Sequence, residues 1–297
     1  MTSGILLVDK PTGITSHDVV SRVRKLAGTR KVGHAGTLDP MATGLLVLGI
    51  DSSTRLLTFL VGLDKEYLAT ISLGFGTTTD DAEGEQVGAA IDTTAITDAS
   101  ILAAIQPLTG DIQQVPSSVS AIKVDGKRSY DRVREGETVT LKARSVTVSA
   151  FDVLEVRRGA RLELDVRVEC TSGTYIRALA RDLGEALGVG GHLTALRRTR
   201  VGPFLVGDAG QLDESLVASL LPPASVASRL FETVDLTGDE VLALTQGKRI
   251  RPGGAKDESS TLPVAAIAPD GRLAGLITLT DGLARVLVNF PSDEVLP

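Results

Sequence analysis

The sequence has few residues that could cross-link it or hold a metal. Cys170 is the single cysteine, so an intramolecular disulfide is excluded. The three histidines, His17, His34 and His192, have no second thiol to complete a zinc site. The acidic residues of 80–85 do not fit the spacing of an EF-hand calcium loop, and we interpret them as an acidic surface loop. We therefore predict a protein that binds no metal.

Long apolar runs are absent as well. The apolar stretch in MTSGILLVDKP is too short for a signal peptide or a membrane span, and no later segment approaches the roughly 20 apolar residues that a span needs. The glycines of residues 33–44 lack the spacing and the lysine of a Walker-type phosphate loop, which argues against nucleotide hydrolysis. We expect a cytoplasmic protein.

A strong excess of positive charge is also missing. The net charge of −6 argues against a protein that coats nucleic acid indiscriminately. Basic residues nevertheless gather in three places, and each group is either a solvated face or a set of contacts for phosphates. The groups are Arg22, Arg24, Lys25, Arg30 and Lys31; Lys123, Lys127, Arg128, Arg132 and Arg134; and Arg197, Arg198 and Arg200.

One carboxylate, Asp39, is set in a loop rich in glycine, GHAGTLDPMATGLL at 33–46. Pro40 disfavours the helical region for Asp39, and the glycines permit turns that other residues resist. The apolar run Leu45–Ile50 predicts a buried strand that anchors the loop. The loop would display a single reactive group. In the alternative interpretation, Asp39 caps a helix that begins at Pro40.

Periodicity predicts a helix and two strands. Residues 16–26 have an apolar stripe at helical spacing, with Ser16 as N-cap and basic residues on the exposed face. Residues 67–75 and 161–170 alternate between apolar and polar, as half-buried strands of an antiparallel sheet do, and Cys170 falls on the inner face.

A second helix is predicted after Thr174, which can act as its N-cap. Arg177 lies off its apolar stripe, in the first turn. A cation there is at the unfavourable end of the helix dipole, which costs about 0.3 to 1 kcal/mol. We expect an anionic partner for Arg177; a solvent-exposed arginine is the alternative.

The remaining organisation is an insertion and a tail. Residues 114–136 predict a short strand, a turn at Asp125-Gly126 and a short charged helix, an excursion that could close over a ligand. Residues 221–230 are typical of a linker. The tail that follows predicts a small β domain with a short helix near Val241–Leu244 and a hairpin turned at Asp270-Gly271.

Four motifs, in order, resemble those of the bacterial tRNA pseudouridine-55 synthases, the TruB family. They are KPTGITS at 10–16, GHAGTLDPMATGLL at 33–46, YLATISLGFGTTTDDAEGE at 67–85 and CTSGTYIRALARDLG at 170–184. The insertion at about 114–137 resembles the thumb-like, RNA-gripping insertion of that family. The tail resembles a PUA domain, a small RNA-binding β-barrel. Val119 departs from the pattern, since many relatives carry an aromatic residue there, which puts one loop contact in doubt.

The resemblance implies roles for individual residues. Asp39 matches the catalytic aspartate, Arg177 the arginine that pairs with it, and Tyr67 the aromatic that stacks on the target uracil. His34 matches a histidine that holds the flipped base, Tyr175 and Leu196 line the base pocket, and Lys10 belongs to a motif that supports the active loop. From the residues alone, Tyr67, Tyr175 and Leu196 could equally be packing residues, and His34 could bond a backbone carbonyl.

The resulting prediction is an α/β (α+β) protein with a mixed, largely antiparallel sheet in a catalytic domain at 1–229 and a PUA-like domain at 230–297. Its reaction would be isomerisation of uridine 55 in the T arm of tRNA, by a monomer without cofactor, protein partner or guide RNA. Arg22, Arg24, Lys25, Lys123, Lys127, Arg128, Arg197 and Arg198 would contact RNA. Two alternatives stay open, an RNA chaperone with a structural Asp39 and a guide-dependent synthase. Asp39 could attack the sugar, attack the ring or remove a sugar proton.

Overall fold

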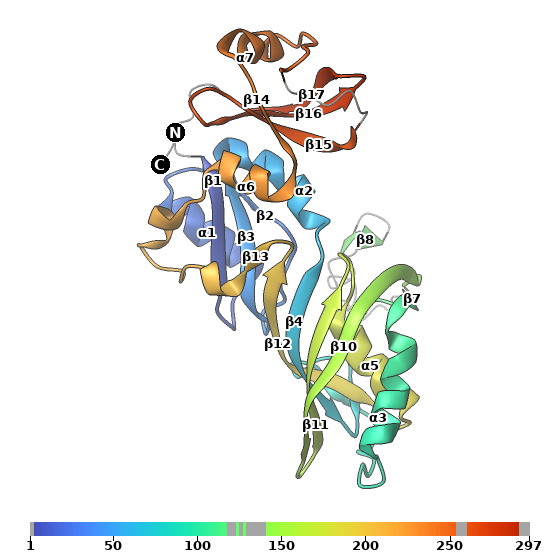
Figure 1. The fold of residues 1–297 in the computed structure, drawn as a ribbon. Helices are drawn as coiled ribbons and strands as arrows, with labels where there is room; N and C mark the ends of the chain where they lie inside the picture. The colour runs from blue at the N-terminus through green and yellow to red at the C-terminus, as the bar shows by residue number, and fades with distance from the viewer. Residues whose placement is uncertain (1–2, 118–122, 125–126, 129–140, 254–259, 291–297) are drawn as a thin grey trace. The chain divides into compact units, whose positions relative to one another are not determined.

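The computed structural model describes residues 3–117, 123–124, 127–128, 141–253 and 260–290 (Figure 1). Its internal contacts divide the chain into two units. Unit 1 comprises Met1–Pro40, Gly44–Val61 and Pro203–Pro297, and unit 2 comprises Met41–Thr43 and Gly62–Gly202. Among the described residues, no helix combines the length and the apolar character that crossing a membrane requires.

Unit 1 begins with a short antiparallel sheet in which β3 pairs with β1 and with β2. The predicted strand at Leu45–Ile50 is confirmed as part of β3, and its residues are buried. The elements of this part are β1 (Gly4–Lys10), α1 (Ser16–Leu26), β2 (Val32–His34), β3 (Thr43–Ile50), η1 (Asp51–Leu56), α2 (Leu57–Val61), β13 (Phe204–Leu205), η3 (Val206–Asp208), η4 (Leu216–Ser219) and α6 (Pro223–Leu230).

The predicted helix at 16–26 is α1, but its N-cap is Thr15 rather than Ser16. Thr15 and Asp18 form a capping box, in which the Thr15 hydroxyl accepts from the Asp18 amide and the Asp18 carboxylate accepts from the Thr15 amide. The Ser16 hydroxyl is buried and binds the backbone of Leu38 instead. The predicted linker at 221–230 is also corrected, because most of it is helix α6.

The C-terminal part of unit 1 forms a four-stranded sheet in the order β14-β15-β16-β17, so the predicted barrel is not formed by the described residues. Only β14 and β15 run parallel. The predicted turn at Asp270-Gly271 joins β15 to β16, with Gly271 at a φ of 81°. The elements are β14 (Thr233–Asp235), α7 (Gly238–Thr245), β15 (Ser260–Ile267), β16 (Leu273–Thr280) and β17 (Leu283–Asn289).

Unit 2 is built on an antiparallel sheet in the order β12-β4-β11-β10-β7. The predicted alternation is confirmed for β11, where every second residue from Leu162 to Cys170 is buried. Its elements are β4 (Lys65–Leu73), β5 (Gly76–Thr77), β6 (Gln86–Val87), α3 (Asp98–Ile105), η2 (Gln106–Leu108), β7 (Gly110–Gln114), β8 (Lys123–Val124), β9 (Lys127–Arg128), β10 (Arg144–Arg158), β11 (Leu162–Cys170), α5 (Ile176–Ala186) and β12 (Gly191–Val201).

Helix α5 packs against β4 and β12 (Figure 1). Close approach depends on Gly184, because a Cβ atom there would lie 2.1 Å from the backbone nitrogen of Gly191. The N-cap of α5 is Tyr175, not the predicted Thr174, whose hydroxyl donates to the carbonyl of Thr171. The sheet and this helix position the residues of the candidate site in unit 2.

Candidate active site

In unit 1, the loop that carries Asp39 is held on both sides of that residue. Before it, the Leu38 amide donates to Ser16 Oγ at 2.8 Å, and Ser16 Oγ donates to the Leu38 carbonyl at 3.0 Å. After it, the Pro40 carbonyl accepts from the Gly13 amide at 2.9 Å. Asp39 itself is half-buried in non-helical backbone, so the alternative of a helix capped by Asp39 is wrong. The first two sequence motifs therefore meet at this loop.

Lys10 is the second support of the loop. Its side chain is fully buried, and Nζ donates to the carbonyls of Pro11 at 2.9 Å, Ile14 at 2.7 Å and Pro40 at 3.3 Å. An ammonium has three donors, and three carbonyls accept from this one, which compensates the cost of burying the charge. Lys10 thus fixes the backbone next to Asp39 and exposes no surface to a substrate.

In unit 2, Arg177 forms a buried ion pair with Asp81. Nη1 of Arg177 lies 3.1 Å from Asp81 Oδ2, and the two side chains are 6% and 3% exposed. The same nitrogen donates to the Thr79 carbonyl at 3.0 Å. The anionic partner expected from the helix dipole therefore exists, and the alternative of a solvent-exposed arginine is wrong.

Asp81 is the partner of Arg177 that the sequence interpretation missed. We predicted an acidic surface loop, yet Asp81 is 2% exposed. Its other oxygen, Oδ1, accepts from the Thr79 hydroxyl at 2.5 Å and from the Glu83 amide at 3.0 Å, so the carboxylate is fixed before it meets Arg177. Asp81 could have been found from the sequence, because Arg177 was expected to have an anionic partner and the motif at 67–85 contains aspartates.

Two of the predicted base-pocket residues, Tyr67 and Leu196, lie on the buried face of the unit 2 sheet. Tyr67 on β4 and Leu196 on β12 are 8% and 7% exposed, and these two strands pair directly. Tyr175 is the N-cap of α5. Its backbone amide donates to Gln114 Oε1 at 2.8 Å, and its carbonyl accepts from Gln114 Nε2 at 3.0 Å. His34, in unit 1, is half-buried at the end of β2. Tyr67, Leu196 and Arg177 thus belong to unit 2, whereas His34 and Asp39 belong to unit 1.

Two further cations share this buried face with Tyr67. Arg198, which pairs with Tyr67 across β12 and β4, is 1% exposed, so it is not part of an exposed basic patch as predicted. Lys65 is 4% exposed and donates from Nζ to the Leu63 carbonyl at 2.5 Å. Burial, together with the charge of Arg198, lowers the pKa of Lys65 to about 8. Burial raises the pKa of the neighbouring Cys170 thiol to about 11.

The basic groups differ in exposure. On α1 and the loop after it, Arg22, Lys25, Arg30 and Lys31 are exposed, whereas Arg24 is half-buried and donates to the Val32 carbonyl. Arg197 is half-buried and donates to the Thr43 hydroxyl at 3.4 Å, and Arg200 pairs with Glu169 at 2.9 Å. The side chains of the second group, including Lys123, Lys127 and Arg128, lie outside the described residues, as does Val119.

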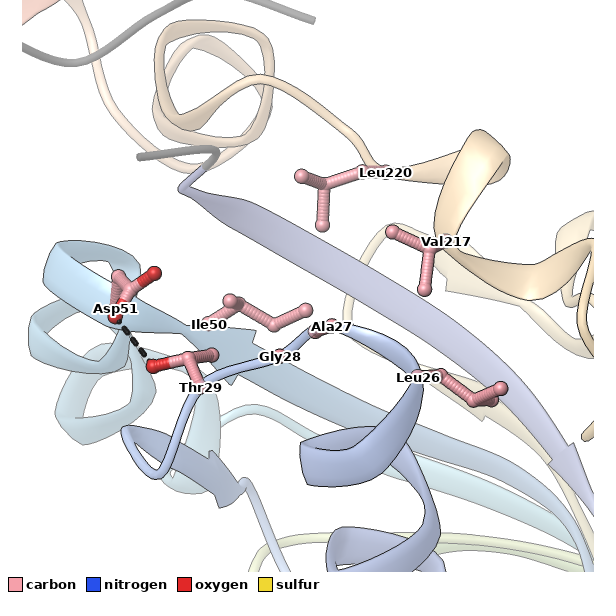
Figure 2. A pocket seen from close by; sticks show the side chains of 8 residues that line it. All are labelled: Leu26, Ala27, Gly28, Thr29, Ile50, Asp51, Val217 and Leu220. Carbon is pink, nitrogen blue, oxygen red and sulfur yellow. Dashed lines mark hydrogen bonds between the residues drawn. The ribbon is translucent and has the colours of Figure 1, made fainter.

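Unit 1 also contains a pocket of about 340 Å³ between α1, the end of β3 and η4. Figure 2 shows its lining, in which the Thr29 hydroxyl donates to Asp51 at 2.8 Å beside apolar side chains. None of the predicted site residues lines it. The lining residues are Leu26, Ala27, Gly28, Thr29, Ile50, Asp51, Val217 and Leu220.

The sequence matches models of known protein families. Residues 24–176 match the TruB family pseudouridylate synthase N-terminal domain. The chain belongs to the TruB family. Two further matches lie after residues 24–176, the tRNA pseudouridylate synthase B C-terminal domain at 177–222 and the tRNA pseudouridine synthase II C-terminal domain at 231–291.

Individual TruB proteins are similar to this chain over almost its whole length. The tRNA pseudouridine synthase B of Leifsonia xyli subsp. xyli is 60% identical over 297 residues, covering 99% of this chain and 98% of the relative. That of Arthrobacter sp. (strain FB24) is 57% identical over 303 residues, covering 99% of each. The resemblance seen in the four motifs is therefore confirmed at the level of the family.

Solved structures share the fold. A chain of an H/ACA RNP bound to a substrate RNA containing 2'-deoxyuridine matches with a TM-score of 0.71 and 25% identity, over 98% of this chain and 86% of that one. A chain of a Cbf5-Nop10-Gar1 complex matches with a TM-score of 0.69 and 26% identity, over 97% and 84%. The mixed α/β architecture with a large sheet is thus the one that TruB proteins share with these chains.

Proposed function

We propose that this chain isomerises uridine to pseudouridine at position 55 in the T arm of tRNA, without cofactor or guide RNA. The observation that carries the proposal is the Asp39 loop, in which Ser16 fixes the residue before Asp39 and Lys10 fixes the residue after it. The identity of 60% to a tRNA pseudouridine synthase B supports the choice of substrate.

The reaction exchanges one bond to the sugar for another. The bond from C1′ to N1 of uracil breaks, the base rotates, and a bond from C1′ to C5 forms, while the proton leaves C5 and N1 gains one. No electrons are gained or lost, so a single positioned carboxylate can serve. We assign this role to Asp39, whether it attacks the sugar, attacks the ring or removes a sugar proton.

Arg177 would orient Asp39 and keep it ionised. A guanidinium carries five N–H donors in a fixed planar arrangement. The contacts to Thr79 and Asp81 both use Nη1, and we propose that the other donors serve Asp39. A neighbouring cation favours the charged form of a carboxylate. In this proposal Asp81 acts through Arg177, whose plane it sets.

The base must leave the RNA stack to reach Asp39, which costs a few kcal/mol. Stacking on Tyr67 would offset part of that cost, and Leu196 and Tyr175 would line the pocket, while His34 holds the flipped arrangement. The exposed basic residues of α1 would contact phosphates. We further propose a boundary at 229/230, with the C-terminal sheet as an RNA-binding domain.

The decisive test compares wild type with Asp39→Asn in the release of tritium from [5-³H]uridine in an unmodified tRNA transcript. We expect the variant to bind tRNA normally but to lose at least about 10³-fold in rate. Asp208→Asn, at an exposed position of the same unit, is the matched control and should keep full activity.

The same assay separates the alternatives. If neither protein releases tritium although both bind tRNA, the chain acts as an RNA chaperone and the proposal fails. Activity of the isolated chain on a bare T-arm hairpin would exclude the guide-dependent reading, which the likeness to an H/ACA RNP chain makes worth testing.

A further inference from the structure

Two arginines on α5 bind two consecutive aspartates of the loop after β5. Arg177 and Arg181 lie four residues apart, so they share one face of the helix. Arg177 pairs with Asp81, and Arg181 Nη1 lies 3.2 Å from Asp80 Oδ2. The proposed reaction uses the Arg177–Asp81 pair and gives no role to the Arg181–Asp80 pair.

Asp80 binds a second partner, which lies at the base of the insertion. Ser117 Oγ donates to Asp80 Oδ2 at 2.6 Å, and Ser117 is completely buried. Arg181 Nη2 also reaches this segment, since it donates to the Val115 carbonyl at 2.8 Å. One carboxylate oxygen therefore joins α5 to Gln114–Ser117, the described residues at the start of the insertion. We call the set Asp80, Ser117 and Arg181 the clasp.

The backbone at Asp80 is specialised for this role. Its φ of 60° lies in the left-handed region, which aspartate and asparagine tolerate better than most other residues. The Asp80 carbonyl accepts from the Leu193 amide at 3.0 Å, which ties the loop to β12. Since Asp81 follows directly, the conformation of Asp80 decides where the Asp81 carboxylate points.

The other end of the same segment reaches the start of α5. The Gln114 side chain exchanges two hydrogen bonds with the backbone of Tyr175, two residues before Arg177, and Gln114 is 1% exposed. The base of the insertion is thus fixed to α5 on either side of Arg177, at Tyr175 and at Arg181.

We propose that Asp80 is a positioning residue for the reaction, which through Ser117 and Arg181 holds the base of the insertion against α5 and thereby holds Arg177 in place. The inference rests on the proposed function. The clasp would keep Arg177 in the position that the reaction needs. Loosening it would slow the chemical step rather than weaken tRNA binding.

The test is single-turnover formation of pseudouridine with enzyme in saturating excess over tRNA. Asp80→Asn keeps the left-handed backbone and an acceptor for Ser117 but loses the charge that ties Arg181 to this loop, while Asp182 still binds Arg181 on α5 itself. We expect its rate to fall about tenfold, because small displacements of an orienting group are costly, with the tRNA Kd changed less than about twofold. Asp281→Asn, also at a left-handed position (φ 51°), is the matched control and should keep the wild-type rate.

Ser117→Ala provides a second variant that removes one hydroxyl and leaves both charges. We expect a rate loss in the same direction, and a combined loss in Asp80→Asn/Ser117→Ala that is smaller than the product of the two single losses, because both residues act in one unit. A normal saturated rate in both variants, with only a lower Tm or a weaker Kd, would overturn the proposal and leave the clasp as a structural brace. Absence of product from wild type itself would instead refute the proposed function, and this inference with it.

Discussion

The two faces of the unit 2 sheet hold charge in opposite ways. On the outward face, Arg157, Arg167 and Arg200 pair with carboxylates of other strands, and these arginines are 37%, 33% and 25% exposed. On the face that α5 covers, the Arg177–Asp81 pair is 6% and 3% exposed and its carboxylate has three donors. The energetic weight of a charged pair in this unit therefore depends more on how far the pair is removed from water than on how many pairs there are.

Breaking the buried pair from one side should have the largest effect. In Asp81→Asn, an amide would replace the buried carboxylate that faces the guanidinium of Arg177, and breaking a buried pair from one side costs about 3 to 5 kcal/mol. We expect a lower free energy of unfolding in urea together with a strong loss of turnover. Replacing both partners, as Arg177→Met/Asp81→Leu, should restore much of the stability but none of the activity. Unchanged stability of Asp81→Asn would show that the pair is not buried in solution.

Lys65 tests the desolvation of the buried face through the pH dependence of stability. Burial lowers its pKa to about 8 from the ordinary 10.5, so between these values the unfolded chain binds more protons and stability rises with pH. From pH 8 to pH 9 this contributes about 1 kcal/mol to the free energy of unfolding, a slope that Lys65→Met should lose.

Above pH 9, Cys170 opposes the rise due to Lys65. Burial raises the pKa of its thiol to about 11 from 9.0, so the folded protein keeps this proton longer, and the contribution of Cys170 to stability declines between these two pH values. Cys170→Ala should remove that decline and leave the rise due to Lys65. Parallel pH profiles of wild type and Lys65→Met between pH 8 and 9 would contradict the assignment.

The outward face should give the smallest effect. Arg157 binds Glu155, Glu163 and Asp165, but at 37% exposure such pairs are worth at most about 1 kcal/mol. We expect Arg157→Met to lower the free energy of unfolding by less than that in low salt, with the difference shrinking in 1 M NaCl as screening increases. Turnover should not change. A loss as large as that of Asp81→Asn would remove the distinction between the two faces.

Much of the site could be predicted because the sequence encodes local features directly. The proline after Asp39 and the glycines around it predicted a loop but left a helix capped by Asp39 open, and alternation along 161–170 predicted β11. Boundaries were less accurate where several residues compete for one role. Thr15 caps α1 because Ser16 is engaged by Leu38, a contact 22 residues away in sequence.

The motifs of the sequence were enough to identify the family to which the chain belongs, and they predict Asp39 and Arg177 as the residues that carry the chemistry. The folded chain was needed to show that Arg177 pairs with Asp81, that Asp80 joins α5 to the base of the insertion, and that Lys10 and Arg198 are buried. The physical reason is that burial and pairing depend on atoms brought together from distant parts of the chain. Arg177 and Asp81 are separated by 96 residues in sequence, and no local pattern specifies their contact.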